Sequence, residues 1–303
     1  MTGPIAIAVS GGVDSLVSAY LLKRQGFDIF GIYFLTGYEN HANPGSKGIQ
    51  GLCRLLDMPV FVIDLKTQFK TMVVDYFIAA YQRGETPNPC LVCNPTIKFG
   101  LLLREACKLG ASRLATGHYA RVEAGQEGRY RLRKGVDRDK DQSYFLSRLT
   151  QDQLAQACFP LGTWTKAQVR ALATEKGLQP VTRQESQDVC FIREATYADF
   201  LTHYVVRIDT QRNRLVVGFK DKLYAGSCRV TDINWIAGVA EGPMAADTRI
   251  RYRHRAVASM VSPVGRDEAV VRFDQPQTAV TPGQGAVFYR GDEVVGAGWI
   301  KNS

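Results

Sequence analysis

A glycine-rich turn near the start of the sequence constrains the fold more than any other feature. Ser10-Gly11-Gly12-Val13-Asp14-Ser15 follows the apolar run Ile5–Val9 and opens the helical run Val13–Gln25. Such a turn directs backbone N–H groups and a helix N-terminus at one anion-sized space. No Lys-Ser or Lys-Thr follows the glycines, so transfer of a γ-phosphate is disfavoured and a pyrophosphate site is favoured. The alternative is a turn in which Ser15 or Asp14 only caps the helix.

Strand-like and helix-like runs alternate beyond this turn. We expect strands at Ile5–Val9, Asp28–Phe34, Val60–Asp64 and Arg113–Thr116. We expect helices at Val13–Gln25, Ser46–Leu56, Gln68–Tyr81 and Ile97–Leu109. This order predicts an α/β fold with a parallel sheet, whose ligand lies at the carboxyl ends of the strands. The loops after Val9, Phe34 and Thr116 therefore matter most.

The rest of the chain divides into two further parts. Asp141–Leu201 is mainly helical in pattern, most clearly at Lys166–Lys176, where Gly177 suits a helix C-cap. After Tyr204, short alternating segments separated by turn residues predict an antiparallel β-domain. We expect a nucleotide-binding domain at 1–150, a helical connector at 151–203 and a barrel-like β-domain at 204–303. The clearest strand segments are Arg207–Ile208, Asn213–Gly218, Ala269–Phe273 and Ala286–Tyr289.

Composition limits the partners and the compartment. The 303 residues are 45% hydrophobic, enough for a full core, but no run approaches the roughly 18 apolar residues of a membrane span. Met1–Val9 lacks the basic flank of a secretory signal, so we expect a cytoplasmic protein with no membrane partner. The net charge of +9 favours a polyanion such as a nucleic acid.

Three of the seven cysteines lie in settings that suit chemistry. Thr86–Asn94 reads TPNPCLVCN, so two prolines stiffen a loop that presents Cys90 and Cys93. Cys190 lies in ESQDVCFI, between a polar and an apolar stretch. The remaining cysteines are interpreted as small packed hydrophobic residues: Cys53, Cys107, Cys158 and Cys228.

Taken together, these motifs resemble the tRNA-specific 2-thiouridylases, members of the N-type ATP pyrophosphatase (PP-loop) superfamily. The resemblance covers nearly the whole chain. Its motifs are SGGVDS at Ser10–Ser15, TPNPCLVCN at Thr86–Asn94, IKF at Ile97–Phe99, ATGHYARV at Ala115–Val122, KDQSYFL at Lys140–Leu146, FPLG at Phe159–Gly162, ESQDVCFI at Glu185–Ile192, DINWI at Asp232–Ile236, RIRYRH at Arg249–His254, AVTPGQGAVFY at Ala279–Tyr289 and GAGWI at Gly296–Ile300.

The resemblance implies an adenine-nucleotide-binding α/β domain and an activity. The family uses ATP to adenylate the C2 oxygen of a wobble uridine in tRNAs for Glu, Gln and Lys and then inserts sulfur. It implies that Cys190 carries a persulfide from a cysteine desulfurase or sulfur-relay protein, and that Cys93 releases the sulfur or forms a disulfide with Cys190. Asp14 is then expected to act at the phosphates or at Mg²⁺.

The same resemblance implies two sets of contacts. ATP is expected to contact the loop and the neighbouring strand ends, at Ala8, Val9, Ser10, Gly11, Gly12, Val13, Asp14, Ser15, Phe34 and Gly117. The tRNA is expected to contact Asn88, Pro89, Cys90, His118, Lys140, Asp141, Gln142, Arg251, Tyr252 and Gln284. For His118 the alternative is a packing or capping histidine.

The sequence departs from the family at three places. The family's G-x-H-x-G and Y-T-I-G-Q-R-x-G-L segment is absent, because the chain passes from Leu201 through Thr202-His203-Tyr204 directly to Val205. Phe34-Leu35-Thr36 stands where many members have Met followed two residues later by Trp. Cys90 replaces a residue that is often Asp, so Cys90, Cys93 and Cys190 could instead ligate a [4Fe–4S] cluster with one open iron. The persulfide and cluster alternatives both stay open.

Two basic clusters support a polyanionic partner. Arg249–Arg255 alternates strictly, so as a strand it would place four arginines on one face, although a solvated edge strand has the same pattern. The second cluster comprises Arg129, Arg131, Arg133, Lys134, Arg138 and Lys140. Two rival functions remain: another PP-loop ligase or sulfurtransferase, or an RNA-binding homologue without catalysis.

Overall fold

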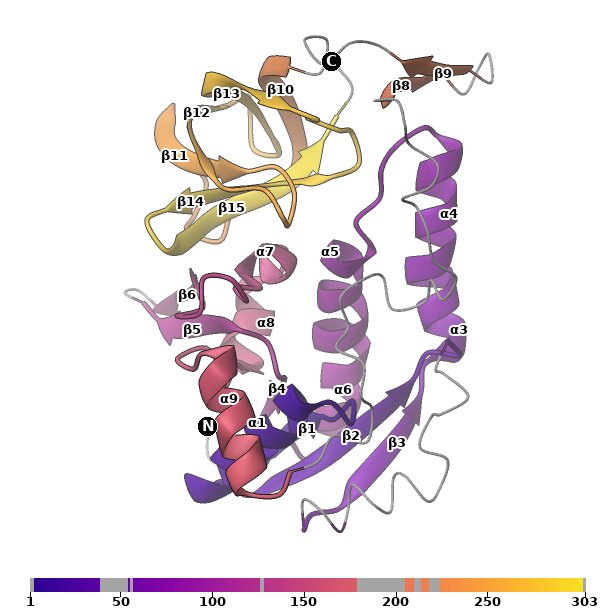
Figure 1. Cartoon of the computed structure of the whole chain (residues 1–303), viewed down its shortest axis with the longest axis vertical. Coiled ribbons are helices and arrows are strands. Elements are labelled where there is room, and N and C mark those ends of the chain that lie inside the picture. Colours follow the sequence, from indigo (N-terminus) through magenta and orange to yellow (C-terminus); the bar gives the residue numbers. More distant parts are fainter. Residues whose placement is uncertain are drawn as a thin grey trace.

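The structure is a computed structural model with two main bodies, a layered α/β body and a β-barrel above it (Figure 1). It describes residues 3–38, 54, 57–125, 128–178, 205–209, 214–217 and 224–301, without the side chains of 205–209 and 214–217. The predicted helix Ser46–Leu56 falls almost entirely outside these residues. No helix among them is long and apolar enough to span a membrane.

A parallel sheet of five strands forms the centre of the α/β body, in the order β3-β2-β1-β4-β7. Its strands are β1 (Ile5–Ala8), β2 (Ile29–Leu35), β3 (Val60–Asp64), β4 (Arg113–Ala115) and β7 (Ala157–Cys158). β1 lies in the middle because Ile7 pairs with Gly31 on one side and with Ala115 on the other. The four strands predicted from the sequence are confirmed, and β7 was not predicted.

Helices cover both faces of this sheet. They are α1 (Val13–Arg24), α3 (Lys66–Phe69), α4 (Asp75–Gln82), α5 (Pro89–Cys93), α6 (Leu103–Lys108), α7 (Ser143–Leu146), α8 (Gln151–Gln156) and α9 (Lys166–Glu175). π-helical turns at Lys70–Val74 and Asn94–Leu102 join α3 to α4 and α5 to α6 into two long helices. The predicted helices α1, α3–α4 and α9 are confirmed. The one predicted at Ile97–Leu109 begins earlier, at Pro89.

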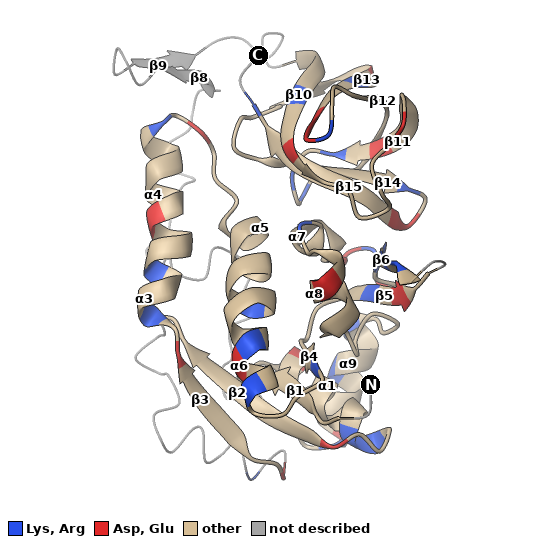
Figure 2. Ribbon diagram, turned by 180° about the vertical axis from the view of Figure 1, so that it is seen from behind, with Lys and Arg blue, Asp and Glu red and all other residues tan. Residues whose placement is uncertain are grey.

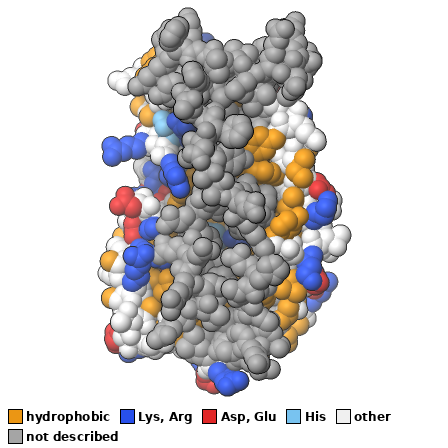
Figure 3. Space-filling view, turned by 45° about the vertical axis from the view of Figure 1, so that its right-hand side comes forward, with side chains coloured by type: hydrophobic (Ala, Val, Ile, Leu, Met, Phe, Trp, Pro, Cys, Tyr) orange, Lys and Arg blue, Asp and Glu red, His pale blue; other side chains and the backbone are white. Residues whose placement is uncertain are grey.

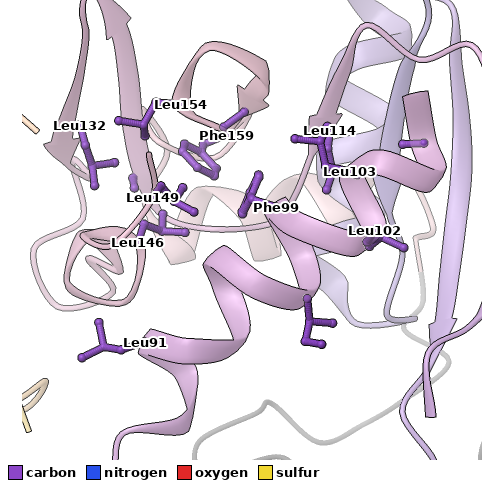
Figure 4. Close-up of a cluster of buried hydrophobic side chains, with 14 of the residues drawn as sticks. Leu91, Phe99, Leu102, Leu103, Leu114, Leu132, Leu146, Leu149, Leu154 and Phe159 are labelled. Carbon is purple, nitrogen blue, oxygen red and sulfur yellow. The ribbon is translucent and has the colours of Figure 1, made fainter. Parts of the chain in front are cut away.

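The main core joins the sheet to the helix that contains the cysteine motif. Leu91, Phe99 and Leu102, from α5 and the π-helical turn, belong to one buried cluster with Leu114 of β4, Leu146 and Leu149. In Figure 4 the Phe99 ring points into this cluster, whereas Leu91 and Leu102 lie to either side of it. All six side chains are at most 1% exposed. This packing fixes the axis of the helix and hence the place of its first turn.

The second body is a closed barrel of six antiparallel strands. They are β10 (Tyr224–Asn234), β11 (Met244–Arg249), β12 (Val257–Pro263), β13 (Glu268–Thr278), β14 (Gly285–Arg290) and β15 (Glu293–Ile300), and pairing of β10 with β15 closes the ring. A hairpin of the first body, β5 (Ala120–Ala124) and β6 (Tyr130–Lys134), joins the same sheet through Glu293 and Arg133. A separate hairpin is formed by β8 (Val205–Asp209) and β9 (Arg214–Val217).

The basic run Arg249–Arg255 is not the strand that its alternation predicts. β11 ends at Arg249, and Thr248 pairs with Val257, so the chain must reverse within the intervening residues. The His254 N–H donates to the Arg251 carbonyl at 3.1 Å in this turn. The prediction of four arginines on one strand face is therefore wrong, because closing the β11–β12 hairpin overrides the two-residue period.

The segment predicted as a helical connector packs within the first body as far as residue 178. β7 extends the parallel sheet beside β4 (Leu114 with Ala157), and α9 lies against α1 (Figure 1). Gly177, with φ of +64°, ends α9 in the left-handed conformation expected of its C-cap. The predicted boundaries at residues 150 and 203 remain predictions.

Candidate active site

The glycine-rich loop lies between β1 and α1, where the sequence predicts a nucleotide site. Gly11 has φ of +77°, which only glycine adopts at little cost. Ser15 is 4% exposed; its hydroxyl donates to the Gly12 carbonyl at 2.9 Å and accepts from the Ser10 N–H at 3.3 Å. The loop is therefore held by its own serine side chains at the N-terminus of α1, a geometry that suits phosphate.

The ends of the neighbouring strands border this loop. Gly117 follows β4, and a Cβ atom there would lie 3.0 Å from both the Cβ and the carbonyl carbon of Asp14. The chain after β4 thus touches the first turn of α1, and a side chain at position 117 would require Asp14 to shift. Phe34, near the end of β2, is half-buried against the main core. Contact of ATP with Gly117 and Phe34 remains a prediction.

Asp14 is held by two residues that sequence reasoning missed. Lys166 Nζ lies 2.8 Å from each carboxylate oxygen, and the Tyr119 hydroxyl donates to Oδ1 at 2.7 Å. The Lys166 side chain is only 8% exposed and that of Asp14 is 33% exposed. Nothing in the sequence marks Lys166, since a lysine in the first turn of an amphipathic helix is ordinarily solvated.

The cysteine motif opens the helix that begins with α5. The Asn88 side chain accepts from the Leu91 N–H at 3.4 Å, and Pro89 takes the first helical position, so the predicted rigid loop is also a helix cap. Cys90 and Cys93 are half-buried and three residues apart, which places them on one face of the first turn. Cys190, the third predicted thiol, lies outside the described residues.

The π-helical turn after Cys93 links the thiols to the end of β4. The Asn94 side-chain amide donates to the Cys90 carbonyl at 2.9 Å and to the Phe145 carbonyl at 3.1 Å. Further along the turn, the Phe99 ring lies 5.8 Å from that of Phe159, and the Phe159 ring lies 6.1 Å from that of His118. Packed rings therefore link the cysteine helix to His118, which follows Gly117 beside the glycine-rich loop.

His118 and the Lys140-Asp141-Gln142 motif have structural partners. His118 is 8% exposed and its Nδ1 lies 2.7 Å from the Thr116 hydroxyl; burial, and then Lys98, lower its pKa well below the ordinary value, so the ring is neutral. Asp141 is 3% exposed and accepts from the Gly135 and Ser143 N–H groups, each at 3.1 Å. Their contact with tRNA remains a prediction, as does that of the half-buried Lys140 and Gln142.

A turn of the barrel lies beside the cysteine motif. The Arg249 guanidinium lies 3.3 Å from Asp141 of the first body and donates to the Tyr252 and His254 carbonyls. The Tyr252 ring lies 4.2 Å from that of Phe145. Burial chiefly raises the pKa of the Tyr252 hydroxyl, and the nearby positive charge of Arg249 opposes the rise.

A second barrel contact fixes the loop before the cysteines. The Gln284 side-chain amide donates to the Thr86 carbonyl at 3.0 Å, and the Thr86 N–H donates to the Pro282 carbonyl at 2.8 Å. The predicted tRNA contact of Gln284 remains a prediction, as does that of Arg251. The sequence distance between residues 86 and 284 hides this contact from sequence reasoning.

Two arginines of the second basic cluster are paired with acidic residues. Arg133 lies 2.7 Å from Asp292 and 2.8 Å from Glu123, and Arg131 lies 3.9 Å from Glu293. Red and blue segments alternate along hairpin β5–β6 and the nearby barrel end (Figure 2). On the described part of the face in Figure 3, basic side chains line both flanks with acidic ones among them. The cluster is therefore not a purely basic surface.

Comparison with known proteins identifies the family to which this site belongs. Residues 4–194 match the model of the tRNA methyl transferase HUP domain, and residues 225–300 match that of the aminomethyltransferase beta-barrel domain. The tRNA-specific 2-thiouridylase MnmA of Desulfosudis oleivorans is 46% identical, over 98% of this chain and 94% of the relative. The chain belongs to the tRNA-specific 2-thiouridylase family.

Other 2-thiouridylase relatives cover the chain equally well. MnmA of Geobacter metallireducens is 39% identical over 98% of this chain and 96% of its own length. MnmA of Geotalea uraniireducens is 38% identical over 99% of this chain and 95% of its own length. The alignment with the Desulfosudis relative spans 341 positions against the 303 residues of this chain. The 2-thiouridylase relative thus has residues with no counterpart here, as expected for a shortened family member.

Proposed function

We propose that this chain is a tRNA-uridine 2-sulfurtransferase that activates the C2 oxygen of a wobble uridine with ATP and replaces it with sulfur. The proposal rests on the connection between the glycine-rich loop, Ser10–Ser15, and the helix that begins at Pro89 and contains Cys90 and Cys93. Gly117 packs on Asp14, the adjacent His118 ring packs on Phe159, and Phe159 packs on Phe99 of the helix that begins at Pro89. The elements proposed for adenylation and for sulfur transfer are therefore joined by packed side chains.

The first step is adenylation of the uridine. The C2 carbonyl of uracil is a poor electrophile whose oxygen cannot leave, so its activation is a prerequisite. The C2 oxygen attacks the α-phosphorus of ATP, the bond to the β-phosphate breaks, and pyrophosphate departs. The loop Ser10–Ser15 suits the pyrophosphate because it combines a helix N-terminus with backbone held in a fixed turn.

The second step transfers sulfur. A persulfide on Cys190 attacks C2 with its outer sulfur, and AMP leaves with the former C2 oxygen. The Cys93 thiolate then attacks the Cys190 sulfur, so the S–S bond breaks, 2-thiouridine is released, and Cys93 and Cys190 become a disulfide. An external dithiol reduces that disulfide before the next turnover. Cys93 is half-buried on a capped helix, so its thiol is held in place and is only partly open to solvent, which suits attack on a single partner sulfur.

The partners follow from the same scheme. The substrate is tRNA with a wobble uridine, of the kind that decodes Glu, Gln or Lys, and the sulfur donor is a cysteine desulfurase or a sulfur-relay protein. The net charge of +9 favours such a polyanion. The turn that carries Arg251, Tyr252 and Arg253 packs on Phe145, whose carbonyl is bound by Asn94 of the cysteine helix, so this turn is placed to contact the anticodon near the reacting base.

The two inorganic cofactors suggested by the sequence fit the described residues unequally. Lys166 and Tyr119 fill three of the roughly four acceptor sites of the Asp14 carboxylate, so Asp14 as placed does not fit a Mg²⁺ ligand. Cys90 and Cys93 could provide two thiolates for a [4Fe–4S] cluster, with Cys190 as the third. Such a cluster would supply an open iron that holds sulfide.

A thiolation assay tests the proposed activity. Unmodified glutamate-type tRNA is incubated with the chain, ATP, Mg²⁺ and a persulfide donor, and its nucleosides are analysed by mass spectrometry. We expect 2-thiouridine at the wobble position and AMP in equal amount. A matched transcript with cytidine at that position should give neither product. ATP cleavage without thiouridine on the uridine transcript would refute the proposal.

Cysteine variants separate the two sulfur chemistries. With a persulfide pair, Cys93→Ala and Cys190→Ala abolish thiolation while Cys90→Ala retains measurable activity. With a cluster, Cys90→Ala loses bound iron and thiolation together. Cys107→Ala is the matched control, because Cys107 is exposed and its thiol donates to the Gln156 side chain of α8. Anaerobic iron and sulfide analysis of each variant provides the second readout.

A further inference from the structure

Lys166 is a buried lysine whose position the helix does not require. It is the first residue of α9, where the helix dipole disfavours a positive charge. The start of α9 is already capped, because the Thr165 side chain accepts from the Gln168 N–H and the Gln168 side chain accepts from the Thr165 N–H. A lysine with an 8% exposed side chain at such a position is costly unless its charge has a partner.

That partner is a carboxylate from the phosphate loop, 152 residues earlier in the sequence. Lys166 Nζ lies 2.8 Å from both oxygens of Asp14, and the Tyr119 hydroxyl holds Oδ1 from another direction at 2.7 Å. Three hydrogen bonds from two donor groups therefore fix the orientation of the carboxylate. Gly117 limits its movement further, since the chain after β4 touches the same residue.

The charge of Asp14 matters because of where it stands. Asp14 belongs to the first turn of α1, beside the backbone expected to bind phosphates. An uncompensated carboxylate there would repel a nucleotide that carries several negative charges, and partial burial would strengthen the repulsion. A neutralising lysine from α9 removes that repulsion. The loop itself contains no lysine that could do so.

We propose that Lys166 is a positioning residue that orients the Asp14 carboxylate and cancels its charge beside the phosphates of the bound nucleotide. This inference rests on the proposed function only in placing ATP at the loop. Nucleotide affinity should therefore depend on the contact between Asp14 of α1 and Lys166 of α9, whereas tRNA affinity should not depend on this contact.

Binding of an uncleavable nucleotide tests the inference without tRNA or sulfur. The probe is ATP with a methylene group between the α- and β-phosphates, titrated calorimetrically with Mg²⁺ present. We expect Lys166→Met to weaken binding at least about tenfold, and Lys166→Arg to stay within about threefold of the wild type because it keeps the charge. The Kd for tRNA and the unfolding temperature of Lys166→Met should stay near wild-type values.

A double-mutant cycle identifies the mechanism. If Lys166 acts by cancelling the charge of Asp14, then Asp14→Asn in the Lys166→Met background should restore affinity to within about threefold of the wild type. Tyr119→Phe, which removes only the hydroxyl and keeps the packed ring, should weaken binding by about threefold. This conservative variant keeps the test valid if Lys166→Met does not fold.

Two results would overturn the proposal. One is wild-type affinity of a folded Lys166→Met variant for the analogue. The other is additive behaviour of Asp14→Asn and Lys166→Met, which would show that the two side chains act independently. Failure of the wild-type chain to thiolate tRNA, with the coupling intact, would refute the proposed function and leave this inference standing.

Discussion

The glycine-rich loop, Ser10–Ser15, and the cysteine motif, Thr86–Asn94, are built in different ways. The loop is local: four residues, 9–12, join β1 to α1, and hydrogen bonds of the Ser10 and Ser15 side chains hold them. The cysteine motif takes its environment from three distant segments, which contribute Phe145, Tyr252 and Gln284. Local encoding lets a motif be recognised from the sequence. A site assembled across two bodies depends on contacts that no short motif reveals.

The largest expected effect separates the two regions by their half-reactions. Asp14→Ala should lower tRNA-dependent AMP formation at least about 100-fold, because the carboxylate and its lysine set the geometry at the phosphates. Cys93→Ala should abolish thiouridine formation and retain AMP formation. Radiolabelled ATP and nucleoside analysis measure the two products, with thermal unfolding as the check on folding. Equal loss of AMP formation in both variants would mean that the regions do not act separately.

Removal of the buried ion pair between the two bodies should have the next largest effect. Asp141 is 3% exposed and lies 3.3 Å from Arg249, so Asp141→Ala leaves a guanidinium and two N–H donors without their acceptor. The free energy of unfolding should fall by about 3 kcal/mol in denaturant titrations. Asp139→Ala, in the exposed part of the same loop, is the matched control. A stability equal to the wild type would show that the barrel contact is dispensable.

The barrel turn that carries Arg251, Tyr252 and Arg253 should contribute to tRNA affinity. Charge reversal of Arg251 and Arg253 should weaken tRNA binding by about tenfold and flatten the dependence of log Kd on salt concentration, because phosphate contacts are lost. Reversal of Arg266 and Arg272 together, an equal charge change at exposed positions elsewhere on the barrel, should have a smaller effect. An unchanged salt slope would mean that the turn only supports Tyr252.

The smallest expected effect concerns Asp292, which joins the barrel to hairpin β5–β6. Burial alone would raise its pKa, but the hydrogen bond from Arg121 and the charges of Arg133 and Arg121 outweigh it, so the pKa lies below the ordinary value. A carboxyl group with a depressed pKa stabilises the fold at pH values above its ordinary pKa near 3.9. This stability is lost as the pH falls through the pKa of the folded state.

Asp292→Asn should therefore reduce the free energy of unfolding by at most about 1 kcal/mol at pH 7, since the carboxylate is partly solvated. The difference from the wild type should shrink in acid, near pH 3. Denaturant titration at both pH values measures it. A larger deficit in acid than at neutral pH would contradict the assigned ion pairs.

The parts that were predictable from the sequence are those with local signals. β1, the glycine-rich loop and α1 follow one another without interruption, and α9 buries the apolar face that its pattern predicts, with Val169, Leu172 and Ala173. Hairpin β5–β6 was missed, although the alternation at Ala120–Ala124 and the glycines at 125 and 128 could have indicated it. The prediction of a strand at Arg249–Arg255 was wrong, because pairing of Thr248 with Val257 in the β11–β12 hairpin requires the chain to turn just after Arg249.

The candidate site was predictable in its residues but not in its contacts. The positions of Cys90 and Cys93 on one helical face follow from their spacing and from the cap at Asn88. Lys166 could not be found this way, because its partner is 152 residues distant and its helix position suggests solvation. Asp141 likewise reads as a surface aspartate, and only the fold of the barrel brings Arg249 to it.

The central claim is that the C2 oxygen of the uridine leaves as part of AMP. A tRNA whose wobble uridine carries ¹⁸O at C2 tests it directly, with the chain, unlabelled ATP and a persulfide donor. The AMP released should be two mass units heavier in a one-to-one ratio to the 2-thiouridine formed. AMP of ordinary mass accompanying full thiolation would contradict adenylation of that oxygen and with it this account of the site.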